Sequence, residues 1–303
     1  MKWKKTISGL MFGIAASSLV GCASSAQNAP KQETTVSDET HMDIACTSVA
    51  IAQILDGLGY DHVIGVPESS GTIPERYQEA KTIGAPMNPD LEIIKSLAPD
   101  LVLSPQTLEA SLGESYRNAG ISSAFLNLSS VDGMYQAVTS LGELLGCQEA
   151  AQRMNQEYQD YMETYRNQVK EEQEILLLMA FPDGFYLIAT ENSYVGNLLN
   201  MAGGKNVYGS DYKGDENGFV NINPEDMIQK NPDRICVFAH YAEKEAFAFM
   251  EKDFAENSIW QHFDAVKEGK ITYLPSEYFG MSANLSWTEA LDYLAPVFQE
   301  ETP

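Results

Sequence analysis

The chain has 303 residues, 44% of them hydrophobic and 10% aromatic, so it is long enough to bury one large core or two medium ones. Its 43 acidic residues against 19 lysines and arginines give a formal net charge of −24 at pH 7. Because no basic block offsets this charge, binding to a nucleic-acid backbone is excluded. No apolar stretch long enough to span a bilayer follows residue 25, which excludes a protein with several membrane spans.

Residues 1–22 have the order of a secretory signal, in which early lysines precede a short apolar run and small residues. Cys22 directly follows Leu-Val-Gly, which resembles the bacterial lipobox, where the thiol is acylated and begins the mature lipoprotein. We expect a signal peptide over residues 1–21 and a lipid on Cys22. An ordinary cleaved signal followed by an unrelated cysteine is the alternative.

Residues 22–42 are expected to form a flexible tether, because they are rich in Ser, Ala, Gln and Thr and have no periodicity. The folded part then lies on the extracytoplasmic face of the membrane, which we expect to be that of a Gram-positive bacterium. Cys46, Cys147 and Cys236 are odd in number and lack CxxC spacing, which indicates small core residues and not a disulfide framework or a zinc site.

From residue 43 onward, short apolar runs alternate with helical periodicity, which is typical of a parallel or mixed α/β sheet. The first half is expected to form an N-terminal lobe over residues 43–147. Its predicted strands are residues 43–46, 62–66, 101–104 and 122–128, and its predicted helices are residues 49–58, 91–97 and 134–145.

Residues 148–172 contain no Gly or Pro and repeat apolar side chains along one stripe. This pattern predicts a single helix of roughly 37 Å, since each residue adds about 1.5 Å. We therefore expect a rigid connecting helix over residues 148–173 and a second α/β lobe over residues 174–303. The strands predicted for that lobe are residues 175–179, 185–189, 234–238 and 271–274, and its helices lie near residues 195–202, 224–230, 243–256 and 287–300.

The two halves share an Asn-Pro phrase followed by acidic residues, at Asn88-Pro89 and at Asn223-Pro224. Asparagine is a good N-cap and proline fits the first helical position. The phrase predicts that each Asn caps a helix and suggests that the two lobes have related architectures.

The order of lipobox, tether, α/β lobe, long helix and second lobe resembles the class III substrate-binding lipoproteins of ABC importers. These proteins bind siderophores, cobalamin or haem between two lobes joined by a rigid helix. Several phrases are similar to those of the haem-binding members found in iron-regulated surface determinant systems. They are Gly84-Ala85-Pro86-Met87-Asn88-Pro89 and residues 186–194, 202–207, 259–266 and 279–284.

The resemblance implies that the chain is a binding protein and not an enzyme. Haem would be its transported ligand, an ABC permease with its ATPase its membrane partner, and haem-donating surface proteins its upstream partners. It also implies that Met87 and His240 hold the haem iron from its two sides. The chain's other histidines, His41, His62 and His262, are not assigned to iron.

The residues themselves support these two ligands to different degrees. Met87 lies between Pro86 and Asn88-Pro89, where prolines fix the backbone, although a gap-filling methionine in a turn is the alternative. His240 follows the apolar run at residues 234–239 and should lie at the carboxyl end of a strand, where open α/β sheets bind ligands. A hydrogen-bonded structural histidine is the alternative.

Further candidates would contact the rest of the haem or the permease. Hydroxyl and N–H groups at element ends are candidates for the propionates, with capping and turn formation as the alternative: Thr47, Ser48, Ser69, Ser70 and Gly71. Side chains proposed for the porphyrin faces, with core packing as the alternative, are Tyr194, Phe279 and Met281. Glu75 and Glu79 are candidates for docking to the permease, or they belong to a solvated helix face.

Two other functions stay open at this level. A siderophore or cobalamin binder of the same class is one, although highly anionic siderophores call for arginine forks and the chain has few arginines. An extracytoplasmic hydrolase is the other, because acidic residues are abundant enough to supply a carboxylate pair. No serine-hydrolase elbow, zinc-protease helix or phosphate-binding loop occurs in the sequence, which disfavours the hydrolase.

Overall fold

The structure is a computed structural model that describes residues 41–69, 71–166, 173–212, 214–215, 217–221 and 224–299. The predicted signal peptide, Cys22 and nearly all of the tether lie outside these residues, as do Ser70 and residues 167–172 of the predicted connecting helix. No helix within the described ranges is long and apolar enough to cross a bilayer.

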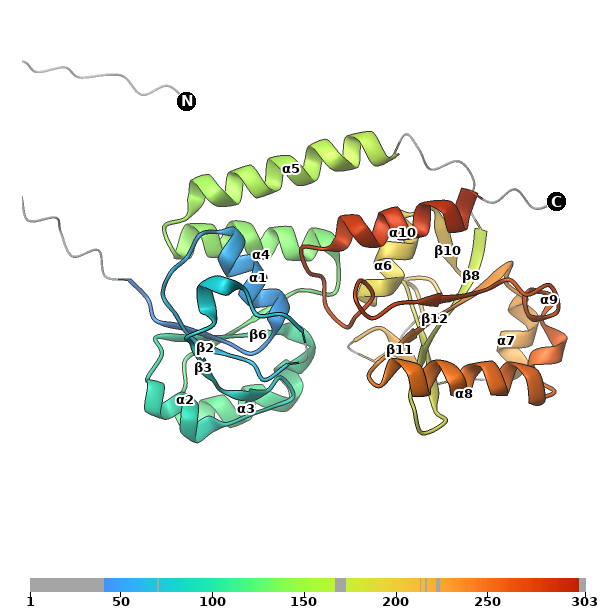
Figure 1. The fold of residues 1–303 in the computed structure, drawn as a ribbon, viewed down its shortest axis with the longest axis horizontal. Helices are drawn as coiled ribbons and strands as arrows, with labels where there is room; N and C mark the ends of the chain where they lie inside the picture. Colours follow the sequence, from blue (N-terminus) through green and yellow to red (C-terminus); the bar gives the residue numbers. More distant parts are fainter. Residues whose placement is uncertain are drawn as a thin grey trace, which may run out of the picture. The chain divides into compact units, whose positions relative to one another are not determined.

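The N-terminal lobe is built on a parallel sheet of five strands in the order β3-β2-β1-β6-β7 (Figure 1). The strands are β1 (Ile44–Cys46), β2 (Val63–Val66), β3 (Lys81–Thr82), β6 (Leu101–Pro105) and β7 (Ser123–Leu126). The helices are α1 (Val49–Gly57), α2 (Leu91–Leu97), α3 (Glu109–Ala119) and α4 (Val131–Leu144), with short 3-10 turns η1 (Glu75–Tyr77) and η2 (Gln106–Leu108). Because the strands are parallel, their carboxyl ends share one edge.

The C-terminal lobe has a mixed sheet with the path β11-β9-β8-β12-β13, and β10 pairs with the start of β8. Its strands are β8 (Gln173–Ala180), β9 (Tyr186–Ala189), β10 (Gly204–Asn206), β11 (Phe219–Val220), β12 (Arg234–Ala239) and β13 (Ile271–Leu274). Its helical elements are α6 (Tyr194–Met201), α7 (Pro224–Lys230), α8 (Glu243–Glu256), η3 (Trp260–His262), α9 (Asp264–Lys267) and α10 (Trp287–Gln299). The pairs β8–β12 and β12–β13 are parallel, whereas β9 and β11 are antiparallel.

The connecting helix α5 (Gln148–Arg166) joins the lobes and packs against α4 and α10 (Figure 1). Four aromatic residues form this contact, which we name the interlobe junction: Tyr135, Tyr158, Tyr161 and Trp287. The rings of Tyr135 and Tyr158 stack at 4.4 Å, and the Trp287 ring meets Tyr158 edge-on at 5.4 Å. The Trp287 indole N–H donates to the Tyr135 hydroxyl at 3.1 Å. Such ring pairs each contribute about 0.5–1.5 kcal/mol beyond the area they bury.

Hydrogen bonds also link the two lobes directly. The Val131 N–H donates to the Asn197 side-chain oxygen at 3.0 Å, and the Ala283 N–H donates to the Leu128 carbonyl at 2.7 Å. A continuous cluster of buried hydrophobic residues runs through both lobes. Because core and bonds are shared, the lobes are braced against large rotations.

One predicted helix start is wrong. Asn88 and Pro89 form strand β5 (Asn88–Pro89), which pairs with β4 (Gly84–Ala85) in a small hairpin, and Asp90 caps α2 by accepting the N–H groups of two following residues. Aspartate caps as well as asparagine, and it lies directly before the first helical residue. Pro224 does begin α7, as predicted, whereas Asn223 lies outside the described residues.

Helix α3 was not predicted. Only Leu112, Gly113 and Tyr116 of its residues are buried, so its apolar stripe is too sparse for a periodicity signal. Cys46 and Cys236 are buried, as predicted for small core residues, whereas Cys147 is only half-buried. All three cysteines are free thiols among the described residues. Burial raises the pKa of the Cys46 and Cys236 thiols to about 12.

Candidate ligand-binding site

His240 is positioned by the pairing of β12 with β8. It directly follows β12, and its N–H donates to the carbonyl of Ala180, the last residue of β8, at 3.1 Å. The imidazole therefore lies at the carboxyl edge of the C-terminal sheet, as the sequence predicts. Ligands bind at this edge in open α/β sheets.

The imidazole of His240 is half-buried, and burial lowers its pKa below the usual value near 6.5. It is therefore neutral at pH 7. Its Nδ1 atom is buried and has no hydrogen-bond partner among the described residues. A neutral imidazole with an unsatisfied nitrogen departs from the usual pairing of buried polar groups and has the protonation state of a metal ligand.

Two aromatic rings flank this imidazole, and a third ring lies against one of them. Together they form what we name the His240 cluster: Phe181, Phe185, His240 and Tyr241. The Phe181 and Tyr241 rings lie 5.2 and 5.5 Å from the imidazole, and Phe185 lies 5.5 Å from Phe181. Phe185 is 49% exposed and Tyr241 55%. Large exposed rings beside a neutral histidine make an apolar surface with a single ligating group.

Met87 occupies the tip of the β4–β5 hairpin, in the two-residue connection between the paired residues Ala85 and Asn88. Its side chain is 66% exposed, which disfavours the alternative of a gap-filling methionine packed in a turn. Gly84 has φ of +93°, and a Cβ there would lie 2.9 Å from the Asp90 nitrogen, so the tight hairpin requires glycine. The hairpin follows β3 and so presents Met87 beyond the carboxyl end of that strand.

A small pocket of about 10 Å³ lies between the lobes, which we name the interlobe pocket. Thr107 and Ser129 line it from the N-terminal lobe, and Tyr194 and Met281 are among its residues from the C-terminal lobe. A wider cavity of about 630 Å³ at the ends of β6 and β7 shares Thr107 and Ser129 with it. The structure thus brings two predicted residues, Tyr194 and Met281, to one place.

Two polar atoms of this pocket are unsatisfied within the described ranges. The Asn217 side-chain oxygen is buried without a hydrogen-bond partner. The Tyr194 hydroxyl is also buried, and although the Asn284 backbone lies near its oxygen, no acceptor takes its proton. Buried polar atoms of this kind are normally paired with protein, water or ligand.

The hydroxyl groups predicted for propionates have local roles. Thr47 is buried, and its hydroxyl donates to the Ser104 oxygen at 2.9 Å. Ser48 caps α1 by accepting the Ile51 N–H. The exposed Ser69 accepts the Gly71 N–H at 3.0 Å, which leaves its own proton free to donate. Capping and turn formation therefore account for most of these residues.

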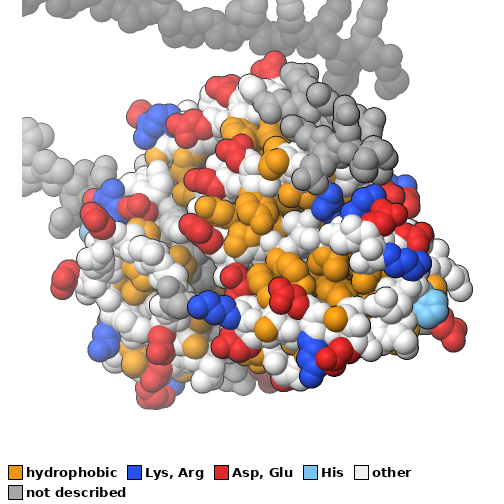
Figure 2. Space-filling view, turned by 45° about the vertical axis from the view of Figure 1, so that its right-hand side comes forward, with side chains coloured by type: hydrophobic (Ala, Val, Ile, Leu, Met, Phe, Trp, Pro, Cys, Tyr) orange, Lys and Arg blue, Asp and Glu red, His pale blue; other side chains and the backbone are white. Residues whose placement is uncertain are grey.

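The other predicted residues fall into two groups. Phe279 is fully buried and packs edge-on against Tyr293, so its burial favours the core-packing alternative. Glu75, in η1, and Glu79 are both exposed. Acidic side chains lie among basic and hydrophobic ones over the face seen in Figure 2, in keeping with the net negative charge.

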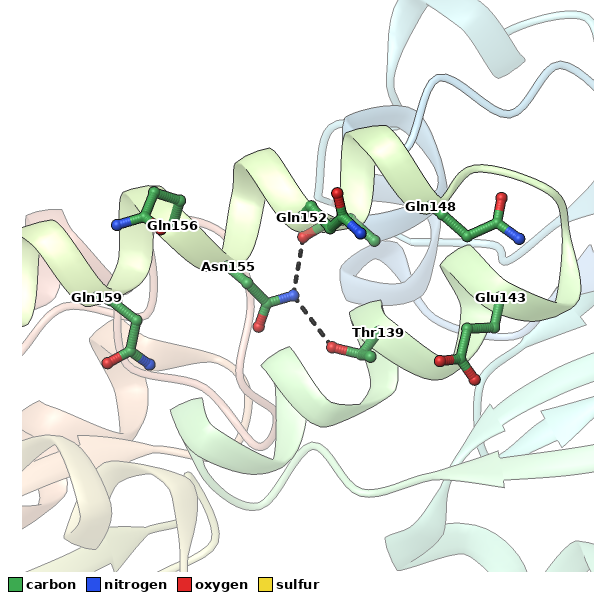
Figure 3. A pocket seen from close by; sticks show the side chains of 8 residues that line it. Thr139, Glu143, Gln148, Gln152, Asn155, Gln156 and Gln159 are labelled. Carbon is green, nitrogen blue, oxygen red and sulfur yellow. Dashed lines mark hydrogen bonds between the residues drawn. The ribbon is translucent and has the colours of Figure 1, made fainter.

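A second large cavity, of about 510 Å³, lies between α4 and α5 (Figure 3). Its lining is mainly amide side chains, and Asn155 crosses it to donate to the Thr139 hydroxyl at 3.1 Å. No methionine, histidine or aromatic residue is among the residues that line it in the described chain. Its chemistry suits neither iron nor a large apolar ligand.

The aromatic members of the His240 cluster were missed by the sequence analysis. Phe181 directly follows β8 and Phe185 directly precedes β9, so both lie at the ends of the turn of the β8–β9 hairpin. Tyr241 comes near Phe181 only through the pairing of β8 with β12. The only signal in the sequence is that aromatic residues flank predicted strand ends.

Comparison with known proteins gives consistent relatives. The profile of the periplasmic binding protein family matches residues 44–278. The high-affinity heme uptake system protein IsdE of Staphylococcus aureus is 32% identical over 280 residues, which cover 91% of this chain and 93% of IsdE.

Two solved structures match with similar strength. An ABC transporter substrate-binding protein from Listeria monocytogenes has a TM-score of 0.80 at 36% identity, covering 86% of this chain and all of the other. Staphylococcus aureus IsdE complexed with heme has a TM-score of 0.79 at 32% identity with the same coverage. These relatives are binding proteins and not enzymes, and they confirm the predicted class III fold with its two α/β lobes. The chain belongs to the periplasmic binding protein family.

Proposed function

We propose that this chain captures haem between its lobes, with His240 and Met87 as the two axial ligands of the iron, and delivers it to an ABC permease. The observation that carries the proposal is the state of His240. It is a neutral imidazole with a buried nitrogen that has no partner among the described residues, and it is flanked by the half-buried Phe181 ring and the exposed Tyr241 ring.

Haem presents two apolar faces around one metal ion, and the His240 cluster matches that chemistry. Exposed phenyl and phenol rings pack well on a planar macrocycle. The imidazole supplies the nitrogen that ferric iron prefers. Because burial lowers its pKa, the imidazole is already neutral at pH 7 and does not have to lose a proton before it binds iron. The similarity to the heme-bound IsdE structure supports the same ligand class.

Met87 supplies the second ligand in this proposal. Its thioether is exposed on a hairpin whose backbone is fixed by strand pairing and by prolines on both sides, so little ordering of the chain is needed on binding. Thioether sulfur is a soft ligand that relatively stabilises ferrous iron. A pair of one hard and one soft ligand holds both oxidation states.

The remaining contacts of haem follow from the predicted residues. Ser69, in the exposed loop after β2, donates its hydroxyl proton to a propionate, and the N–H of Gly71 orients that hydroxyl through its bond to the Ser69 oxygen. Met281, which is half-buried and lines the interlobe pocket, contacts the porphyrin, and the buried Tyr194 supports this wall of the pocket. Thr47, whose hydroxyl is already bonded to Ser104, acts only as support for this edge.

The proposal includes a location and a route of delivery. Cys22 carries the lipid anchor on the outer face of the membrane, and the exposed Glu75 and Glu79 pair with basic residues of the permease. Haem arrives from surface proteins upstream. The shared core and interlobe junction allow only small closure of the lobes, so release depends on the permease and not on a wide hinge motion.

Anionic siderophores are disfavoured as the ligand. Arg76 donates to Asp56 at 2.8 Å and also bonds Asp61, and Arg234 donates to the Thr272 hydroxyl at 3.0 Å. Arginines that are already paired are poor forks for a catecholate or carboxylate complex.

The direct test is a titration of the purified apoprotein with ferric haem, metal-free protoporphyrin, cobalamin and a ferric siderophore. We expect haem to bind most tightly and to produce a sharp Soret band, since it alone gains bonds from both axial ligands. Tighter binding of cobalamin or of the siderophore contradicts the proposal.

The anchor has a separate test. Cys22→Ala should move the protein from the membrane fraction to the medium, or leave an unprocessed precursor, without changing haem binding by the purified folded part. Unchanged membrane attachment of the variant contradicts the lipid anchor alone.

A further inference from the structure

The β8–β9 hairpin holds two phenylalanine side chains in a fixed arrangement. Phe181 N–H donates to the Phe185 carbonyl at 2.9 Å, which closes the hairpin between them. Gly184 has φ of +93°, and a Cβ built there lies 3.1 Å from the Phe249 ring of α8. Phe249 packs against the turn of the hairpin at Gly184. The rings of Phe181 and Phe185 are therefore held in position before a ligand binds.

The rings of this region differ sharply in their exposure. Phe181 packs against His240 and is half-buried, whereas Phe185 and Tyr241 are about half exposed. Met87, on the other lobe, is the most exposed of the large hydrophobic residues within the described chain. Exposed apolar side chains that flank a ligating group and are held by strand pairing are typical of a surface completed by a ligand.

We infer that Phe185 and Tyr241 are specificity-determining residues that cover the His240 side of a flat macrocycle and set how long it stays bound. This inference rests on the proposed haem function and deepens it. Phe181 is a positioning residue, because its ring contacts the imidazole and fixes the side from which iron is approached.

Two kinds of contact contribute to binding of the macrocycle in this proposal, and they can be measured separately. Axial ligation needs iron, whereas ring contact with the porphyrin face needs only a flat apolar macrocycle. The contribution of Phe185 and Tyr241 should therefore be the same for haem and for metal-free protoporphyrin. A corrin, whose faces carry projecting groups, should gain little from the same rings.

The experiment compares wild type with Phe185→Ala, Tyr241→Ala and the double variant. Release of ferric haem to an excess of a scavenging globin and the dissociation constant of metal-free protoporphyrin, from its fluorescence, are measured for each. We expect the double variant to release haem about tenfold faster and to bind metal-free protoporphyrin about tenfold more weakly, with an unchanged Soret position. The Tyr241→Phe variant should behave like wild type in both measurements, because it keeps the aromatic ring.

Leu144→Ala is the matched control, because Leu144 is 52% exposed on α4 and is not part of the proposed site. It should change neither measurement. If wild type binds haem and the double variant behaves like wild type, the inference fails while the proposed function stands. If wild type binds neither porphyrin, the proposed function fails, and the inference fails with it.

Discussion

The interlobe junction and the His240 cluster are both groups of aromatic rings, but they differ in burial and in hydrogen bonding. In the interlobe junction, the rings of Tyr135, Tyr158 and Trp287 are buried, and the Trp287 N–H has its acceptor. In the His240 cluster, the rings are in contact, yet two of them are half exposed and the imidazole has an unpaired nitrogen. Buried rings whose polar atoms are paired stabilise the fold, whereas exposed rings beside an unpaired nitrogen are available to a ligand.

Substitution of Trp287 should have the largest effect on stability. Trp287→Ala removes a buried side chain that contacts three tyrosines across both lobes and α5, so we expect the free energy of unfolding to fall by about 3–5 kcal/mol. Denaturant unfolding measures this loss, and far-UV circular dichroism should follow it because that signal does not depend on tryptophan fluorescence. A loss below about 1 kcal/mol would show that the junction does not brace the lobes.

Substitution of His240 should weaken haem binding and leave the stability of the fold almost unchanged, in contrast to substitution of Trp287. We expect His240→Ala to weaken ferric-haem binding more than tenfold, roughly, because the nitrogen ligand of the harder ferric ion is lost. The free energy of unfolding should change little, since no hydrogen bond of the imidazole is removed among the described residues. Titration and unfolding of the same preparation test both parts, and a large loss of stability with intact binding would reverse the assignment.

Substitution of Met87 should give a smaller and distinct effect. Met87→Ala should retain ferric haem better than His240→Ala does, open one coordination position to water and lower the reduction potential of the haem. Stability should stay within about 0.5 kcal/mol of wild type, since the side chain is exposed. Redox potentiometry decides the point, and a raised potential would contradict thioether ligation.

The smallest expected effect is on pH dependence in the apoprotein. Burial lowers the pKa of His240, so below the unfolded value near 6.5 the unfolded chain binds the proton more readily than the folded chain. The contribution of the neutral imidazole to the free energy of unfolding is therefore fully present above that pH, and it is lost as the pH falls toward the lowered pKa of the folded state. His240→Ala should flatten this part of the stability profile, and an identical profile in the variant would show that the imidazole is not desolvated.

The order of strands and helices could be predicted from the sequence where apolar periodicity is strong. Strand β12 and helix α10 have nearly the predicted bounds. The β4–β5 hairpin was missed, because two-residue strands give no periodic signal and Asn88-Pro89 satisfies the rule for a helix start as well as that for a turn.

The candidate site could be predicted only in part, for a reason of chain separation. Met87 and His240 were identified from family phrases and their flanking residues. Phe181 and Tyr241 come together through the register that places Ala180 beside Ala239, and such long-range pairing is not encoded in any local pattern. The exposure of Met87, which separates a ligand from a packing residue, likewise needs the folded chain.

In the proposed complex, His240 and Met87 together hold one haem iron. Electron paramagnetic resonance and absorption spectra of the ferric complex test it most directly, because two strong protein ligands give a six-coordinate, low-spin iron. We predict a low-spin spectrum for wild type that becomes high-spin or water-ligated in either single variant. A high-spin, five-coordinate spectrum in wild type, or a low-spin spectrum that survives both substitutions, would contradict the claim.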